Sequence, residues 1–184
     1  MTKEFSATKK IVVGGIFLAL AMIIGRFRIV IPYGGIPFLK ISLSGPIYKF
    51  VAIILGPMYG GIIPAAADFI GALLNPIGSY IWAFTLVAFV KGFLIGFIWR
   101  HAKFLKQFYI RLTVSVLIPS IISSIINTFV MKIYLLLPEN IFIVVLISRL
   151  TKEFLMAIFN IIILAIMIDA YKKIISLHGG KNEF

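Results

Sequence analysis

Long apolar stretches, separated by short polar or turn-forming segments, dominate the chain. A helix that crosses a bilayer needs about 20 mostly apolar residues, and the clearest such stretch covers residues 112–131 without a charge. The pattern predicts an all-α integral membrane protein whose single domain, residues 1–184, consists of six transmembrane helices. The expected spans are residues 11–31, 44–55, 57–74, 80–99, 109–137 and 141–170.

The segment between the first two spans departs from this pattern. Residues 32–37 contain two prolines and two glycines, which predicts a turn-rich external loop. Residues 38–43 follow and are compatible with an extended segment.

A glycine- and alanine-rich stretch, residues 56–71, carries one carboxylate, Asp68. Small residues let neighbouring helices approach closely in lipid, where packing drives association. A carboxylate is costly in hydrocarbon, so we expect Asp68 to face protein or a water-filled cavity. The remaining helices would then form the walls of that cavity.

The composition supports the membrane assignment and argues against several classes of function. The 184 residues are 61% hydrophobic, against about 45–50% in soluble domains. The formal charge of +12 lies inside apolar segments and short loops, which argues against nucleic acid as a partner. The chain has no cysteine and only two histidines, both in basic segments. With no metal-ligand spacing, Ser-His pair or phosphate loop, we expect neither an enzyme nor a bound cofactor.

The loop charges predict the orientation. The 100–106 loop and the 171–184 tail are basic, whereas the turns after the third and fifth spans hold no lysine or arginine. The positive-inside rule therefore places both termini in the cytoplasm. Arg26, Arg28 and Lys40 are the exception, because they fall on the outer side.

Several polar residues inside the spans fall at a similar outer depth, at about 1.5 Å of rise per residue. They come from four helices: Arg26, Asp68, Asn127, Lys132, Arg149, Lys152 and Glu153. Internal ion pairs, such as Arg149 with Glu153 or Asp68 with a lysine, are one interpretation. Four basic residues face two acidic ones, however, and a positive excess in a partly dry cavity suits an anionic ligand.

Aromatic residues accompany these charges at the outer level. They are Tyr33, Phe38, Tyr80, Trp82 and Phe84. An interfacial aromatic belt and a stacking wall for a flat ring are both compatible with this placement. Lys91 lies deeper and is compatible with snorkelling or ion pairing.

Gly15 and Ala19 are four residues apart and share one face of the first helix. Such small-xxx-small pairs support close helix packing, either within the chain or against a partner subunit.

Several motifs together resemble a known family. They are Gly25-Arg26-Phe27, Ile41-Ser42-Leu43, residues 54–61 (ILGPMYGG), residues 67–80 (ADFIGALLNPIGSY), Phe84-Thr85-Leu86, Asn127-Thr128 and Arg149-Leu150-x-Lys152. They are similar to the substrate-binding (S) component of energy-coupling factor (ECF) transporters, which are bacterial vitamin importers. Within that family the chain most resembles the folate-specific branch.

The resemblance implies a six-helix S-component of the bacterial cell membrane that captures its vitamin on the outer side with high affinity. It also implies docking, through Gly15 and Ala19, onto a membrane scaffold subunit driven by two ATPases. The family motif there is Ala-x-x-x-Ala, from which Gly15 departs. The expected substrate-binding residues are Arg26, Asp68, Tyr80, Asn127, Lys132, Arg149 and Lys152.

Two other functions fit the same residues. One is an S-component for another vitamin or precursor, such as hydroxymethylpyrimidine or pantothenate. The other is a self-contained secondary transporter or small-solute channel, although the chain shows no internal repeat of the kind many secondary transporters have.

Overall fold

The computed structural model describes residues 6–33, 36–42, 44–74, 80–135 and 138–177. This part of the chain consists of helices and a single two-stranded antiparallel sheet. In chain order the elements are α1 (Ala7–Arg26), β1 (Arg28–Tyr33), β2 (Ile36–Ser42), α2 (Ser44–Leu55), α3 (Pro57–Leu74), α4 (Trp82–His101), a short 3-10 helix (Ala102–Phe104), α5 (Phe108–Leu135) and α6 (Glu139–Leu177).

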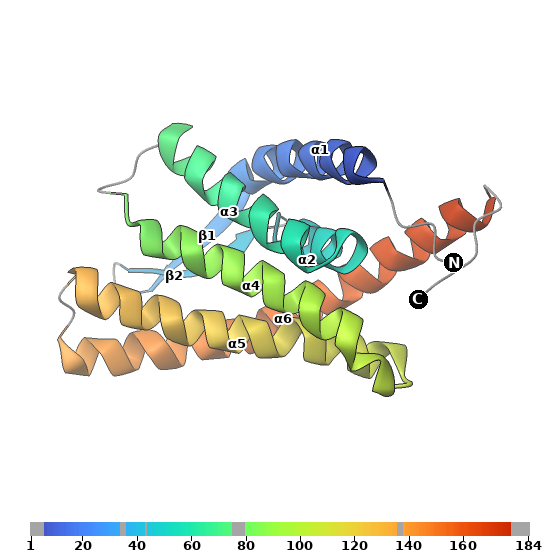
Figure 1. Cartoon of the computed structure of the whole chain (residues 1–184). Coiled ribbons are helices and arrows are strands. Elements are labelled where there is room, and N and C mark those ends of the chain that lie inside the picture. The colour runs from blue at the N-terminus through green and yellow to red at the C-terminus, as the bar shows by residue number, and fades with distance from the viewer. Residues whose placement is uncertain (1–5, 34–35, 43, 75–79, 136–137, 178–184) are drawn as a thin grey trace.

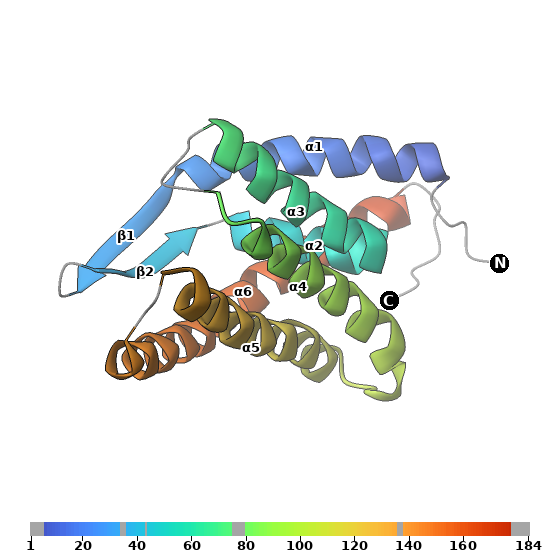
Figure 2. The ribbon, with the colours of Figure 1, turned by 60° about the vertical axis from the view of Figure 1, so that its left-hand side comes forward.

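Helix α4 lies at the centre of the bundle and packs against α2, α3 and α5. Helices α1 and α3 lie on one side of it, and α5 and α6 lie on the other (Figure 1). The β1–β2 hairpin projects at the end where α3 finishes and α4 begins (Figure 2). The main core, between α2, α4, α5 and α6, contains Phe50, Ile95, Trp99 and Leu164.

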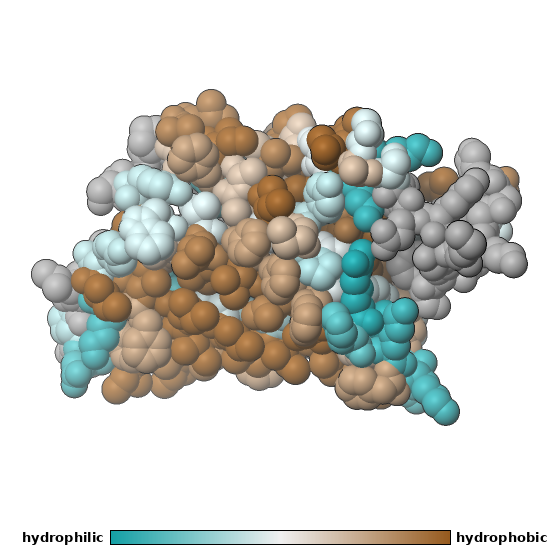
Figure 3. Space-filling model, in the orientation of Figure 1, coloured by the Kyte–Doolittle hydropathy of each residue, from teal (hydrophilic) through white to brown (hydrophobic). Residues whose placement is uncertain are grey.

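Five of the helices are long and apolar enough to cross a membrane, whereas α2 has only 12 residues. Apolar side chains cover the middle of the visible face, and hydrophilic ones gather towards its ends (Figure 3). Helix α6 has 39 residues, about 58 Å at 1.5 Å each, so it continues beyond a hydrocarbon core of about 30 Å. This is the architecture of a multi-pass membrane protein.

Small residues explain how closely α3 approaches α4. Pro64 lies inside α3 and has no N–H to bond the carbonyl of Gly60. That carbonyl instead faces Gly92 of α4, where a Cβ would collide with it.

Gly56, between α2 and α3, has φ +93°. This is a left-handed conformation that favours glycine, and it permits the sharp reversal between the two helices.

The helical bundle is as predicted, and α2 and α3 have the expected bounds. The first span is shorter than predicted, because α1 ends at Arg26 rather than near residue 31. Residues 28–33 are rich in β-branched side chains and pair with β2, which shifts them from helix to strand. The extended segment expected at 38–43 is confirmed for residues 38–42, while residue 43 lies outside the described residues.

Candidate functional site

A cavity of about 750 Å³ lies between α1, α2, α3 and α4. Small residues from all four helices line much of it, and these side chains are too short to fill the space between the backbones. They are Ala21, Gly25, Gly45, Ala67, Gly71, Ala72, Ala88 and Gly92. Tyr48 of α2 contributes an aromatic side chain to the same wall.

Charged groups from all four helices line this larger cavity. Arg26 ends α1, Lys49 lies in the middle of α2, Asp68 is on α3 and Lys91 is on α4. Lys49 is only 6% exposed. The lining thus combines three cations with one carboxylate.

A smaller cavity of about 270 Å³ adjoins the first on the side of α5 and α6. Asp68, Ala88 and Lys91 line both cavities. The smaller one is completed by Phe84, Val87, Asn127 and Arg149.

Asp68 is oriented by a chain of hydroxyl groups. The hydroxyl of Thr85 donates to Asp68 Oδ2 over 2.5 Å, so Tyr80 Oη donates to Thr85 Oγ1, also at 2.5 Å. The ring of Tyr80 packs edge-on against Phe69, with centroids 5.9 Å apart. Tyr80 therefore acts on the cavity through Thr85 and Asp68 rather than by lining it.

Glu153 does not pair with Arg149, which was one of the interpretations open from the sequence. Its carboxylate lies 3.6 Å from Lys91 Nζ and accepts a hydrogen bond from Ser124. Arg149 instead directs Nη2 at the sulfur of Met131. Among the described residues, Arg149 has no carboxylate within salt-bridge distance, and Glu153 pairs with Lys91 of α4 instead.

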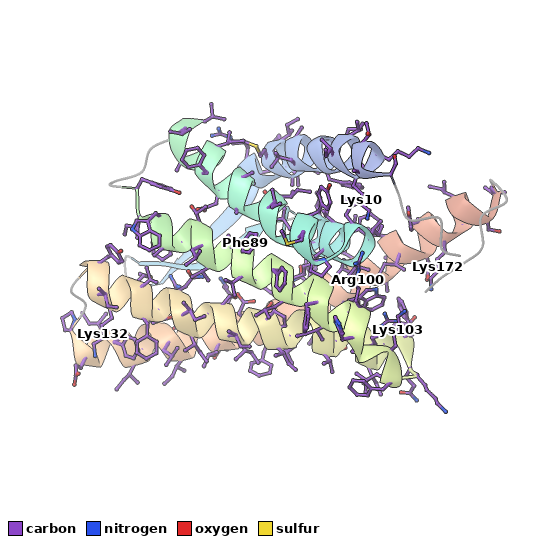
Figure 4. All side chains as sticks on the ribbon, viewed as in Figure 1. Lys10, Phe89, Arg100, Lys103, Lys132 and Lys172 are labelled. Carbon is purple, nitrogen blue, oxygen red and sulfur yellow. The ribbon has the colours of Figure 1, made fainter. Side chains whose placement is uncertain are left out.

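The structure brings together four of the seven predicted ligand-binding residues as cavity lining: Arg26, Asp68, Asn127 and Arg149. Lys152 is half-buried on α6 and lines neither cavity. Lys132 lies at the far end of the bundle (Figure 4), where its Nζ is 3.2 Å from Glu139.

Some of the predicted aromatic residues fit a stacking wall for a ligand ring, and others fit an interfacial aromatic belt. Phe84 lines the smaller cavity, whereas Trp82 is 60% exposed and fits an interfacial belt. Tyr33 and Phe38 lie outside the residues whose side chains the structure describes.

The sequence did not predict a place in the site for Tyr48, Lys49, Thr85 or Ala88, and it was compatible with Lys91 as a snorkelling or paired lysine. Lys49 carried a usable signal, since a charge inside a short apolar helix marks a functional position in membrane proteins. Ala88 carried none, because one alanine among many shows nothing before the helices are packed. No described group of three or more His, Asp or Glu residues is placed to hold a metal ion.

Gly15 and Ala19 are both exposed on the surface of α1. A Cβ added to Gly15 would meet no other atom within 4 Å, whereas Gly14 packs against Ile63 of α3. The described residues of the chain therefore leave this small-residue face uncovered.

The sequence pattern of the family "ECF transporter, substrate-specific component" matches residues 9–168. The chain is 32% identical over 120 residues to a UPF0397 protein of Enterococcus faecalis, covering 61% of this chain and 62% of that protein. It is 32% identical over 69 residues to the folate transporter FolT of Clostridium novyi, covering 38% and 36% of the two chains. These alignments span less than two thirds of either relative.

Solved structures show the same fold. A crystal structure of FolT bound with folic acid superposes with a TM-score of 0.66 at 26% identity, over 85% of this chain and 91% of that one. The S-component for biotin from an ECF-type ABC transporter gives a TM-score of 0.66 at 22% identity, over 92% and 95%. The S component of another bacterial ECF transporter gives 0.69 at 15% identity, over 92% and 99%.

Proposed function

The chain belongs to the family of ECF transporter substrate-specific components, and from that premise we propose that it captures a folate-type vitamin for import. In this proposal the two adjoining cavities bind the vitamin with high affinity from the outer side of the bacterial cell membrane. The protein then delivers the vitamin to an ATP-driven import complex.

The observation that carries this proposal is the charge balance of the site. Arg26, Lys49, Lys91 and Arg149 line the cavities, and Asp68 is the lining carboxylate. Glu153 adds one negative charge against Lys91, which leaves two cations in excess. Uncompensated charge is costly in a membrane interior, so an anion fits this excess of basic residues.

Folate matches these groups in its chemistry. It carries two carboxylates at one end and an amino-oxo ring at the other. Guanidinium and ammonium groups recognise carboxylates, and the carboxylate of Asp68 can accept from the ring's N–H groups. A FolT relative and a FolT structure with folic acid support this choice over pantothenate or hydroxymethylpyrimidine.

Docking on a partner is the second part of the proposal. The exposed Gly15–Ala19 face of α1 would meet a membrane scaffold subunit that is driven by two ATPases. Lys10, Arg100, Lys103 and Lys172 gather at one end of the bundle (Figure 4). The positive-inside rule supports a cytoplasmic location for this end, and in this proposal both termini lie in the cytoplasm.

A titration of the purified protein with folic acid tests the binding proposal. We expect saturable binding at one site, with pantothenate and hydroxymethylpyrimidine failing to compete at a hundredfold excess. Competition by either compound at equal concentration would assign the site to another vitamin. Binding of none of the three would refute the proposed function.

A further inference from the structure

The turn between α4 and α5 carries basic and aromatic side chains that alternate along a short exposed segment. Arg100 lies in the last turn of α4, Lys103 lies in the 3-10 helix and Lys106 lies just before α5, and all three are exposed. Phe104 is 79% exposed and Tyr109 is 64% exposed. We refer to these five side chains as the turn surface.

The length of the turn places this surface at the edge of the membrane. Residues 105–107 alone separate two stretches that are long and apolar enough to cross a bilayer, Trp82–Phe104 and Phe108–Tyr134. A connection this short keeps the turn close to the headgroups. At that level an aromatic ring can lie against apolar carbon while a neighbouring lysine reaches the phosphates.

Contacts with the core hold the turn in place. The ring of Phe108 packs edge-on against Trp99, with centroids 5.9 Å apart, and Lys172 Nζ of α6 lies 4.5 Å from the Phe108 ring centroid. Arg111 lies over the ring of Trp99 and donates from Nε to the carbonyl of Trp99 over 3.0 Å. Two cations at this end therefore serve the fold, and the turn is ordered without a partner.

The three cations of the turn surface have a different environment. Among the described residues, no carboxylate lies within salt-bridge distance of Arg100, Lys103 or Lys106, and none of the three lines a cavity. The guanidinium of Arg100 lies against Gly56, where a Cβ would collide with it, so the basic surface reaches the turn between α2 and α3. Arg100 and Lys103 lie at the same end of the bundle as Lys172 (Figure 4).

We infer that the turn surface binds the headgroups of anionic phospholipids. The phosphates accept hydrogen bonds from Arg100, Lys103 and Lys106, and the rings of Phe104 and Tyr109 lie at the boundary with the acyl chains. An acidic protein surface would match the cations but would give these two exposed rings no apolar surroundings. This inference goes beyond the proposed function, because it concerns the protein with or without a vitamin.

Energy transfer from a dye on α5 to labelled lipids tests the inference. The chain contains no cysteine, so Gln107→Cys gives one exposed donor site beside the turn surface, and Tyr134→Cys gives a matched exposed site at the other end of α5. The purified protein is placed in phosphatidylcholine bilayers that contain a trace of acyl-labelled phosphatidylglycerol or acyl-labelled phosphatidylcholine. We expect about twofold or more excess transfer to phosphatidylglycerol from position 107 and equal transfer to both lipids from position 134. Both leaflets have the same composition, so the result does not depend on the direction of insertion.

Charge variants show whether the lysines cause the excess. Lys103→Gln combined with Lys106→Gln should remove most of it, and each single substitution should remove part of it if the double variant folds poorly. Lys132→Gln removes one cation at the far end of α5, where the lysine is paired with Glu139, and should leave the excess unchanged. Raising the salt concentration to 1 M, where the Debye length is about 3 Å, should also reduce the excess.

Equal transfer to both lipids from position 107, or an excess that the lysine substitutions leave intact, would overturn the inference. If the bilayers show no preference but the double lysine variant loses vitamin uptake in cells, the turn surface contacts a protein partner instead. An excess at position 107 in a protein that binds no folic acid would refute the proposed function and leave the lipid surface standing.

Discussion

Replacing Ala19 by tryptophan is expected to abolish vitamin uptake while leaving ligand binding by the isolated protein nearly unchanged. Helices associate in lipid by close van der Waals packing, which small residues permit. Ala19 is exposed on α1, one turn from Gly15, and lines neither cavity. An indole at this position would hold a partner helix away without touching the ligand.

The discriminating measurement pairs an uptake assay in cells that carry the ATPase module with an equilibrium binding assay on the same variant. Leu86→Trp places the same side chain on another exposed face, at a position that is 54% exposed on α4, and should retain uptake. Binding lost as severely as uptake in Ala19→Trp would mean that this face supports the fold rather than docking.

Replacing Arg149 by alanine is expected to weaken folic acid binding by about 1.5–3 kcal/mol, the usual value for a hydrogen bond to a charged group. This corresponds to roughly 10- to 150-fold in the dissociation constant. Arg149 lines the smaller cavity, and no described carboxylate pairs with it. Its guanidinium is therefore available to the ligand.

Lys132→Ala is the informative comparison for Arg149→Ala. Both residues were predicted from the sequence as ligand-binding cations, but Lys132 lies beside Glu139 at the far end of the bundle. We expect a clearly smaller loss of affinity in Lys132→Ala, measured by the same titration. Equal affinity of Arg149→Ala and the unmodified protein would show that Arg149 serves structure and would remove it from the site.

The sequence predicted the membrane bundle and the presence of a charged cavity for one physical reason. Charge inside an apolar segment is costly, so each such residue must face protein, water or a ligand. Arg26, Asp68 and Arg149 were predicted in this way, and all three line the cavities.

The pairing of these charges could not be predicted from the sequence. Which lysine meets Glu153 depends on the rotation of α4 and α6 about their axes, and packing against neighbouring helices sets that rotation. Arg149 stands four residues before Glu153 on the same helix, yet Lys91 of α4 makes the ion pair.

The strand at residues 28–33 was not predicted from the sequence, because an apolar β-branched run next to a helix resembles a continuation of that helix.

Mass spectrometry of the small molecules released from the freshly purified protein tests the central claim most directly. High-affinity binding predicts that the protein retains its vitamin during purification and releases a folate on denaturation. The amount released should approach one molecule per chain, and it should fall sharply in Arg149→Ala purified in parallel. Release of a different vitamin in that stoichiometry, or of no vitamin from a protein that remains folded, would contradict the account.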